Sequence, residues 1–254
     1  MDAPEAPAVV LLHAFPLAPA MFDQARLLLD PRLRVLAPGL AGFGGVPVPA
    51  APPSMDVLAD DVARLLDEHA LASAVVAGVS MGGYVALAFA RRHPHRLRGL
   101  VLASTRAGAD TPQARARRER IARTVEDERG VRVLHEEVAP GLVGPTSRAL
   151  RPDVVQDVAR LVDTAPVRAV AWAQRAMAVR PDSTGSLEGI TVPALVLAGE
   201  EDTIAPVAEA RALAAALPHG RLGTVAGAGH LIALERPAEF AAALSGLLAD
   251  VVDR

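Results

Sequence analysis

The segment 78–82, with the sequence GVSMG, constrains the fold of this chain more than any other. It follows the apolar run 74–77, which predicts a buried strand, and it leads directly into a helical pattern over 81–92. A serine on so tight a strand-to-helix turn has a strained backbone, and its neighbours must be glycines because strand and helix come too close for side chains. The alternative is a plain helix-capping serine. The strand before the turn and the helix after it favour an exposed Ser80 at a helix N-terminus, where free N–H groups stabilise negative charge.

Strand and helix patterns alternate on both sides of this turn. Short apolar, β-branched runs predict buried strands, and apolar residues three and four apart predict helices. The predicted strands are 8–12, 34–37, 74–77, 97–103, 194–198 and 221–225, and the predicted helices are 54–69, 81–92, 207–217 and 237–251. This alternation predicts the α/β class, with a mostly parallel central sheet flanked by helices.

The segment Arg106–Ser186 interrupts the alternation. It is rich in arginine, has a helical period and contains no convincing strand, and prolines break it at several points. We interpret it as a helical insertion, so that residues 1–105 and 187–254 form a core domain and residues 106–186 form a cap. An insertion after the strand 97–103 emerges at the carboxyl edge of the sheet, where ligands bind in open α/β folds.

The composition excludes several kinds of chemistry. The chain has no cysteine and no lysine, which excludes disulfides, thiolate catalysis, cysteine-based metal sites, Schiff-base enzymes and Walker A loops. No G-x-G-x-x-G follows the first strand, which disfavours a dinucleotide-binding dehydrogenase. A net charge of −3 indicates neither nucleic-acid nor membrane binding. With an acidic N-terminus and only a short apolar run there, we expect a cytoplasmic protein without signal peptide or membrane span. We also expect neither a cofactor nor a metal.

A serine hydroxyl needs a base to act as a nucleophile, and a histidine base needs an acid to fix its tautomer. His230 is the best base because it follows the glycine-rich loop 226–229 that leaves the last predicted strand. The weaker candidates lie at helix ends or in the insertion: His69, His93, His95, His135 and His219. Asp202 is the preferred acid because it follows the strand 194–198, and its neighbours Glu200 and Glu201 are rivals.

Two backbone N–H groups are expected to stabilise an oxyanion beside Ser80. One belongs to Met81, which directly follows the serine, and the other to Phe15, in the loop after the first strand.

Four segments together resemble the α/β-hydrolase superfamily, in particular its esterase and 3-oxoadipate enol-lactonase-like branch. These segments are LLHAFP at 11–16, GVSMGG at 78–83, GEEDTIAP at 199–206 and GAGH at 227–230. They span the chain, and the order Ser, Asp, His is that of this superfamily. The resemblance implies an α/β-hydrolase fold with a Ser80–His230–Asp202 triad and a helical cap. The chain departs from the family where His13 is followed by alanine instead of glycine.

The residues that contact substrate are harder to predict. His13, at the end of the first strand, is one candidate. Within the insertion, Arg168, Trp172 and Arg175 fall on one helical face, so that two arginines beside an aromatic wall would bind a substrate carboxylate. The alternative, which we favour, is an amphipathic helix whose arginines are solvated while Trp172 packs.

The expected activity is hydrolysis of a small carboxylic ester or lactone through an acyl-Ser80 intermediate, with a small molecule as partner. A thioesterase, a C–C bond hydrolase and a cofactor-free haloperoxidase use the same fold, which cannot decide between them. A non-turnover small-molecule sensor is the alternative from another class. The sequence carries no information on oligomeric state.

Overall fold

A computed structural model describes residues 8–127 and 130–252 of the chain. These residues form one parallel sheet of six strands in the order β2-β1-β3-β4-β5-β6. The strands are β1 (Val9–Leu12), β2 (Val35–Leu36), β3 (Ala74–Val79), β4 (Leu97–Ala103), β5 (Ala194–Gly199) and β6 (Gly220–Val225). Each overlaps a strand predicted from the sequence, and the α/β class is confirmed. Strands β1, β3 and β5 are buried along their whole length, as in a sheet covered on both faces.

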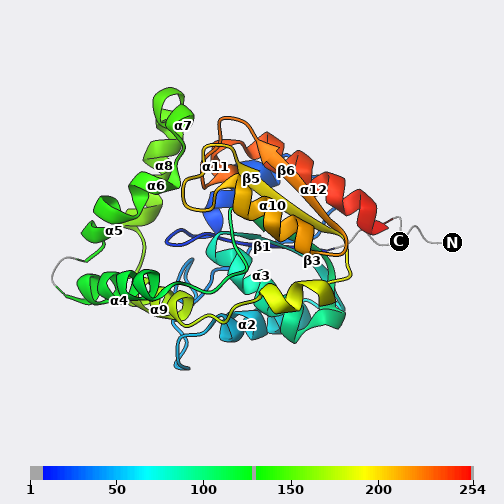
Figure 1. The fold of residues 1–254 in the computed structure, drawn as a ribbon, viewed down its shortest axis with the longest axis horizontal. Helices are drawn as coiled ribbons and strands as arrows, with labels where there is room; N and C mark the ends of the chain where they lie inside the picture. The colour runs from blue at the N-terminus through cyan, green and yellow to red at the C-terminus, as the bar shows by residue number, and fades with distance from the viewer. Residues whose placement is uncertain (1–7, 128–129, 253–254) are drawn as a thin grey trace.

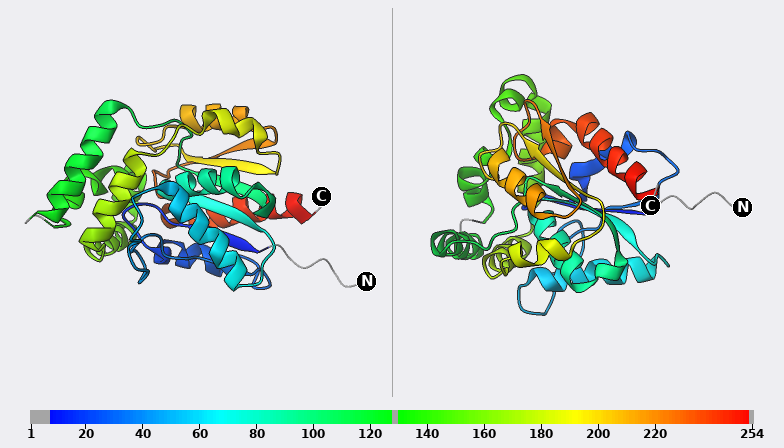
Figure 2. Two further views of the ribbon diagram at one scale, coloured as in Figure 1. Left: turned by 90° about the horizontal axis from the view of Figure 1, so that it is seen from below. Right: turned by 45° about the vertical axis from the view of Figure 1, so that its right-hand side comes forward.

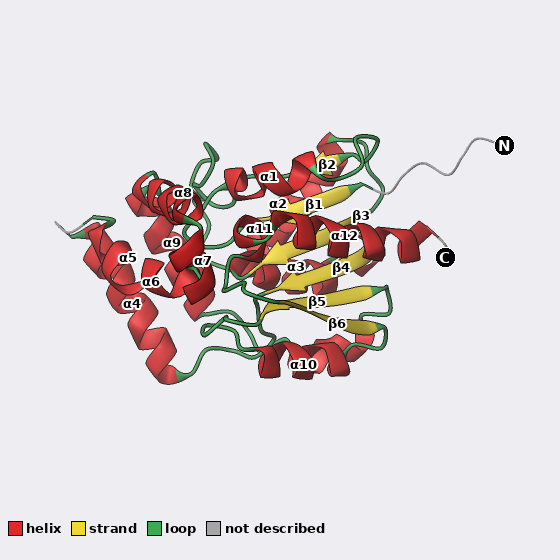
Figure 3. Ribbon diagram, turned by 90° about the horizontal axis from the view of Figure 1, so that it is seen from above, coloured by secondary structure: helices red, strands yellow, loops and turns green. Residues whose placement is uncertain are grey.

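Helices cover both faces of the sheet (Figures 1 and 3). On one face α2 (Met55–Glu68) packs against α3 (Met81–Arg92), and on the other α1 (Asp23–Leu27) packs against α12 (Pro237–Val252). Helix α10 (Val207–Ala216) lies against β5 and β6. The short elements η1 (Pro19–Phe22), η2 (Pro94–Arg96), η3 (Thr184–Gly189) and α11 (Ile232–Glu235) were not predicted, because so few residues show no periodicity.

The insertion between β4 and β5 is helical. It comprises α4 (Pro112–Glu126), α5 (Arg132–Glu137), α6 (Ala139–Leu142), α7 (Pro145–Leu150), α8 (Pro152–Asp163) and α9 (Val167–Ala178), and its described part contains no strand. Pro145 and Pro152 occupy the first turns of α7 and α8, where a missing N–H costs nothing. The prolines therefore begin new helices.

The position of a ligand site follows from the strand order. The chain passes from β1 to β2 on one side and to β3 on the other, so the order reverses at β1. Ligands bind in open α/β sheets outside the carboxyl ends of the strands at such a point. Helices α4 to α9 lie beyond those ends, and the strands point toward them (Figure 3; Figure 2, left). None of the described helices has both the length and the apolarity to cross a membrane.

Candidate active site

Ser80 lies on a sharp turn between β3 and α3. Its φ of 53° and ψ of −111° are strained for a residue with a side chain. The flanking glycines allow the close approach, because a Cβ on Gly78 would lie 2.2 Å from the Gly82 oxygen and one on Gly82 would lie 2.1 Å from the Leu12 oxygen. The glycine requirement expected from the sequence therefore has a direct steric cause.

Hydrogen bonds to the end of strand β4 and to the residues after it hold this turn. The Ser80 N–H donates to the Ala103 carbonyl at 2.9 Å. The Thr105 hydroxyl donates to the Ser80 carbonyl at 2.9 Å. These bonds help hold the backbone at Ser80 in its strained conformation.

The structure brings Ser80, His230 and Asp202 together in one hydrogen-bonded chain. His230 Nε2 lies 2.8 Å from Ser80 Oγ, and His230 Nδ1 lies 2.8 Å from Asp202 Oδ2. Both His230 and Asp202 are buried. A carboxylate can only accept here, so Nδ1 carries the proton and Nε2 is free to accept the serine hydroxyl proton.

Asp202 is set up to remain ionised. Its second oxygen, Oδ1, accepts the N–H groups of Ile204 at 2.8 Å and Ala205 at 2.9 Å. Burial raises the pKa of the Asp202 carboxyl, but the hydrogen bonds and the charge interaction with His230 outweigh burial, so the pKa lies below its usual range.

The two rival acids point elsewhere. Glu201 accepts the Thr146 N–H at 2.9 Å and also the hydroxyl of that residue, while Glu200 is exposed. Of the three neighbouring carboxylates, Asp202 is the one bonded to His230.

The two expected oxyanion donors lie next to this chain. Met81 occupies the first position of α3, and Phe15 lines the same cavity as Ser80. The N–H of Ala14, beside Phe15, is donated to Met21 Sδ at 3.2 Å. Neither the Phe15 N–H nor the Met81 N–H is bonded to a described residue, so both are available to a ligand.

A cavity of about 180 Å³ opens onto Ser80 and His230. Its wall on the sheet side includes Phe15, and its wall on the insertion side includes Arg117, Arg118 and Gln174. Candidate site residues from both parts of the chain therefore face one space.

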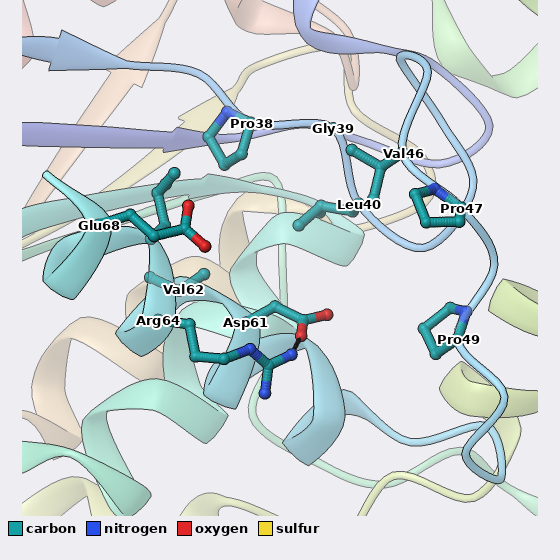
Figure 4. Close-up of a pocket in the computed structure, with 11 residues that line it drawn as sticks. Pro38, Gly39, Leu40, Val46, Pro47, Pro49, Asp61, Val62, Arg64 and Glu68 are labelled. Carbon is teal, nitrogen blue, oxygen red and sulfur yellow. Dashed lines mark ion pairs between the residues drawn. The ribbon is translucent and has the colours of Figure 1, made fainter.

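A larger hollow of about 370 Å³ lies between the loop Pro38–Pro49 and α2, and Figure 4 shows its lining. It contains neither Ser80 nor His230. Its Arg64 forms an ion pair with Asp61 (Figure 4), so these charges compensate each other. The smaller cavity is therefore the candidate active site.

His13 does not line the cavity, which corrects the expectation that it contacts substrate. It is fully buried, its Nδ1–H donates to the Ala14 carbonyl at 3.0 Å, and its Nε2 accepts the Leu40 N–H at 3.0 Å. Burial lowers the pKa of His13 to about 4, against a smaller opposing effect of the bond to Ala14. His13 thus joins the loops that follow β1 and β2 as a neutral imidazole.

The arginine pair expected on α9 is also not in the cavity. Trp172 is buried and its Nε1–H donates to the Ala51 carbonyl at 3.2 Å. Arg175 binds both oxygens of Glu126, at 2.7 and 2.6 Å, and Arg168 is exposed. This helix face packs on a loop of the core and on α4, away from Ser80. Trp172 packs as in the amphipathic alternative that we favoured from the sequence, whereas Arg175 is bound by Glu126 and not simply solvated.

Sequence reasoning missed the buried carboxylate of Glu235. It accepts the N–H groups of Gly144 at 2.9 Å, Gly229 at 3.0 Å and Leu231 at 3.1 Å. Two of these residues flank His230, and Gly144 belongs to the insertion. The one available signal was an acidic residue directly after the apolar run 231–234.

The chain belongs to the alpha/beta hydrolase fold family, whose model matches residues 7–237. It is similar to a thermophilic esterase from Thermogutta terrifontis, solved with malate bound, at 38% identity and a TM-score of 0.93, covering 96% of this chain and 90% of that one. It is similar to the enol-lactonase of Burkholderia xenovorans at 28% identity and a TM-score of 0.88, covering 96% and 92%. It is 31% identical to the pimeloyl-[acyl-carrier protein] methyl ester esterase of Aromatoleum aromaticum, covering 97% of this chain and 98% of the relative. These matches confirm the superfamily and branch that the sequence resembles.

Proposed function

We propose that this protein is a serine hydrolase that cleaves a small carboxylic ester or lactone through an acyl-Ser80 intermediate. The observation that carries the proposal is the chain Ser80 Oγ–His230 Nε2 and His230 Nδ1–Asp202 Oδ2, with 2.8 Å at each step. A hydroxyl becomes a useful nucleophile when a positioned base takes its proton. The relatives named as esterases and an enol-lactonase support the same class of reaction.

The hydrogen-bonded chain supports the following acylation step. His230 Nε2 takes the proton of Ser80 Oγ as the oxygen attacks the ester carbonyl. The N–H groups of Met81 and Phe15, with the N-terminus of α3, stabilise the negative charge on the tetrahedral intermediate. The charge on Asp202 stabilises the imidazolium of His230, which then gives its proton to the leaving alkoxide.

Deacylation repeats the same steps with water. His230 takes a proton from water as the water oxygen attacks the acyl-Ser80 carbonyl. The tetrahedral intermediate collapses, the acid leaves, and the proton returns to Ser80 Oγ. With a lactone, the alcohol and the acid leave as one hydroxy acid.

We also propose that residues 106–186 act as the cap of this enzyme and residues 1–105 and 187–254 as its core. In support, Arg117, Arg118 and Gln174 of the insertion line the cavity that opens onto Ser80. Such a cap selects substrates and limits the access of water.

A fluorophosphonate probe tests the nucleophile. We expect one covalent adduct, which mass spectrometry locates on Ser80, and no adduct on heat-denatured protein. Ser80→Ala should lower kcat by about 10⁴-fold or more, because only oxyanion and binding effects remain. An adduct on another serine of active protein contradicts the assignment.

Steady-state assays on esters, lactones and acyl thioesters test the reaction class. We expect many turnovers per molecule on at least one small ester or lactone. Near-stoichiometric turnover would instead indicate a sensor, and turnover of thioesters alone would indicate a thioesterase.

A further inference from the structure

The cavity beside Ser80 carries arginine side chains that the proposed mechanism does not use. Arg117, on α4, donates from Nη2 to the Glu137 carbonyl oxygen at 2.6 Å. No carboxylate in the described part of the chain forms an ion pair with Arg117. Its positive charge therefore lies at the cavity without an acidic partner among residues 8–127 and 130–252.

Arg118, the next residue, is held in a fixed position. Its Nε binds Asp110, and its Nη1 donates to Gln174 Oε1 at 3.1 Å. Asp110 is almost buried and also binds Arg180, at 2.7 Å. Burial raises the pKa of the Asp110 carboxyl, but the two arginines outweigh burial and hold the pKa below its usual range. Arg118 and Arg180 share the carboxylate of Asp110, and the charge of Arg180 also acts on the nearby carboxylate of Asp182.

Glu137 also lines the cavity, but it does not cancel this surplus. Arg120 binds both of its oxygens, at 2.7 and 2.5 Å. The pair is neutral as a whole. The insertion side of the cavity consequently has an excess of positive charge at Arg117, which lines the cavity beside Arg118 and opposite Ser80 and His230.

We propose that Arg117 and Arg118 form an anion-binding subsite, which selects esters or lactones that carry a second, ionised carboxylate. The inference rests on the proposed function and names its substrate class. Guanidinium groups bind carboxylates with strong, charge-assisted hydrogen bonds. A cavity of about 180 Å³ suits a short substrate, such as a monoester of a small dicarboxylic acid.

Matched substrates test the subsite. Monomethyl glutarate and methyl pentanoate have the same chain length and differ in the terminal carboxylate. We expect the wild-type protein to prefer the acidic ester in kcat/KM, and the preference to fall about tenfold in Arg117→Met, which corresponds to about 1.4 kcal/mol. Raising the salt concentration should also reduce the preference, because Arg117 is exposed and its charge is screened.

Arg123→Met is the control. Arg123 lies on the same helix, binds Glu119 and does not line the cavity. It removes the same charge, so it should leave the preference unchanged. An equal loss of preference in both variants would mean that the overall positive charge of the insertion attracts the acidic ester, which would overturn the subsite. No loss in Arg117→Met would overturn it as well.

A binding measurement separates the subsite from the reaction. Calorimetric titration of Ser80→Ala with monomethyl glutarate and with methyl pentanoate needs no turnover, and only the first of these esters carries a carboxylate. We expect monomethyl glutarate to bind at least about tenfold more tightly, and Arg117→Met in the same background to remove the difference. Equal binding of both esters refutes the subsite even if esters are hydrolysed, while selective binding without ester turnover in the wild-type protein refutes only the proposed function.

Discussion

Replacing Glu235 with alanine should destabilise this protein more than almost any other single polar substitution. The carboxylate is fully buried, and its two oxygens accept three backbone N–H groups, those of Gly144, Gly229 and Leu231. In Glu235→Ala these donors stay buried and lose their acceptor. The loop that carries His230 and its contact with the insertion are both affected.

The magnitude follows from the number of donors. Each buried N–H left without an acceptor costs about 1–3 kcal/mol, so alanine should cost about 3–9 kcal/mol. Glu235→Gln should cost less, about 1–3 kcal/mol. The glutamine oxygen can take the place of Oε2 and still accept the N–H groups of Gly144 and Gly229, whereas the glutamine NH₂ group then faces the Leu231 N–H and cannot accept it. Native domains are stable by about 5–15 kcal/mol, so the alanine variant is close to unfolding.

Urea unfolding, followed by circular dichroism and by the single tryptophan, Trp172, measures both variants. Glu239→Ala is the control, since Glu239 is an exposed acid near the start of α12 and should change stability by less than about 1 kcal/mol. A loss below about 1 kcal/mol in Glu235→Ala, or a larger loss in Glu235→Gln than in Glu235→Ala, would refute the reasoning.

Three further predictions concern the turn, the acid and pH. Gly82→Ala places a Cβ 2.1 Å from the Leu12 oxygen, so it should destabilise by about 1–3 kcal/mol in thermal unfolding and lower kcat. Asp202→Asn should lower kcat by about 10³–10⁴-fold, whereas Glu201→Gln should change it less than about tenfold because Glu201 bonds Thr146 instead of His230. The pKa of His13 lies at about 4 in the fold against 6.5 in the unfolded chain, so between these pH values the unfolded chain binds a proton that the folded protein does not. The free energy of unfolding should therefore be highest above pH 6.5 and should fall by about 3 kcal/mol as the pH drops to 4.

Each of these has a control or a contrary outcome. Gly246→Ala, on α12 with open space around it, should leave stability unchanged or raise it slightly. If Glu201→Gln were more damaging than Asp202→Asn, the assignment of the acid would be wrong. In His13→Gln the part of the pH dependence between 4 and 6.5 that belongs to this residue should disappear, and an unchanged profile would contradict its buried, neutral state.

Much of the fold and the centre of the candidate site were determined by the sequence alone. Apolar runs predicted the inner strands of the sheet, because strands buried on both faces need apolar residues at nearly every position. The edge strands β2 and β6 are only partly buried, and their position in the alternation of strands and helices helped to predict them. The glycines around Ser80 predicted the strained turn, because no other residue fits where α3 meets β1. The loops carrying Asp202 and His230 follow neighbouring strands of a parallel sheet, so their meeting with Ser80 was also predictable.

The wall of the cavity was decided only by the tertiary structure. Arg117 and Arg175 both lie on helices of the insertion, and the spacing of residues around them does not indicate which one faces the cavity. One faces the cavity, while the other is bound by Glu126. His13 and Glu235 likewise have partners far away in the chain, at Leu40 and Gly144. Local patterns report which residues are buried in a strand or helix, but which side chains meet across a cavity depends on how separate elements pack.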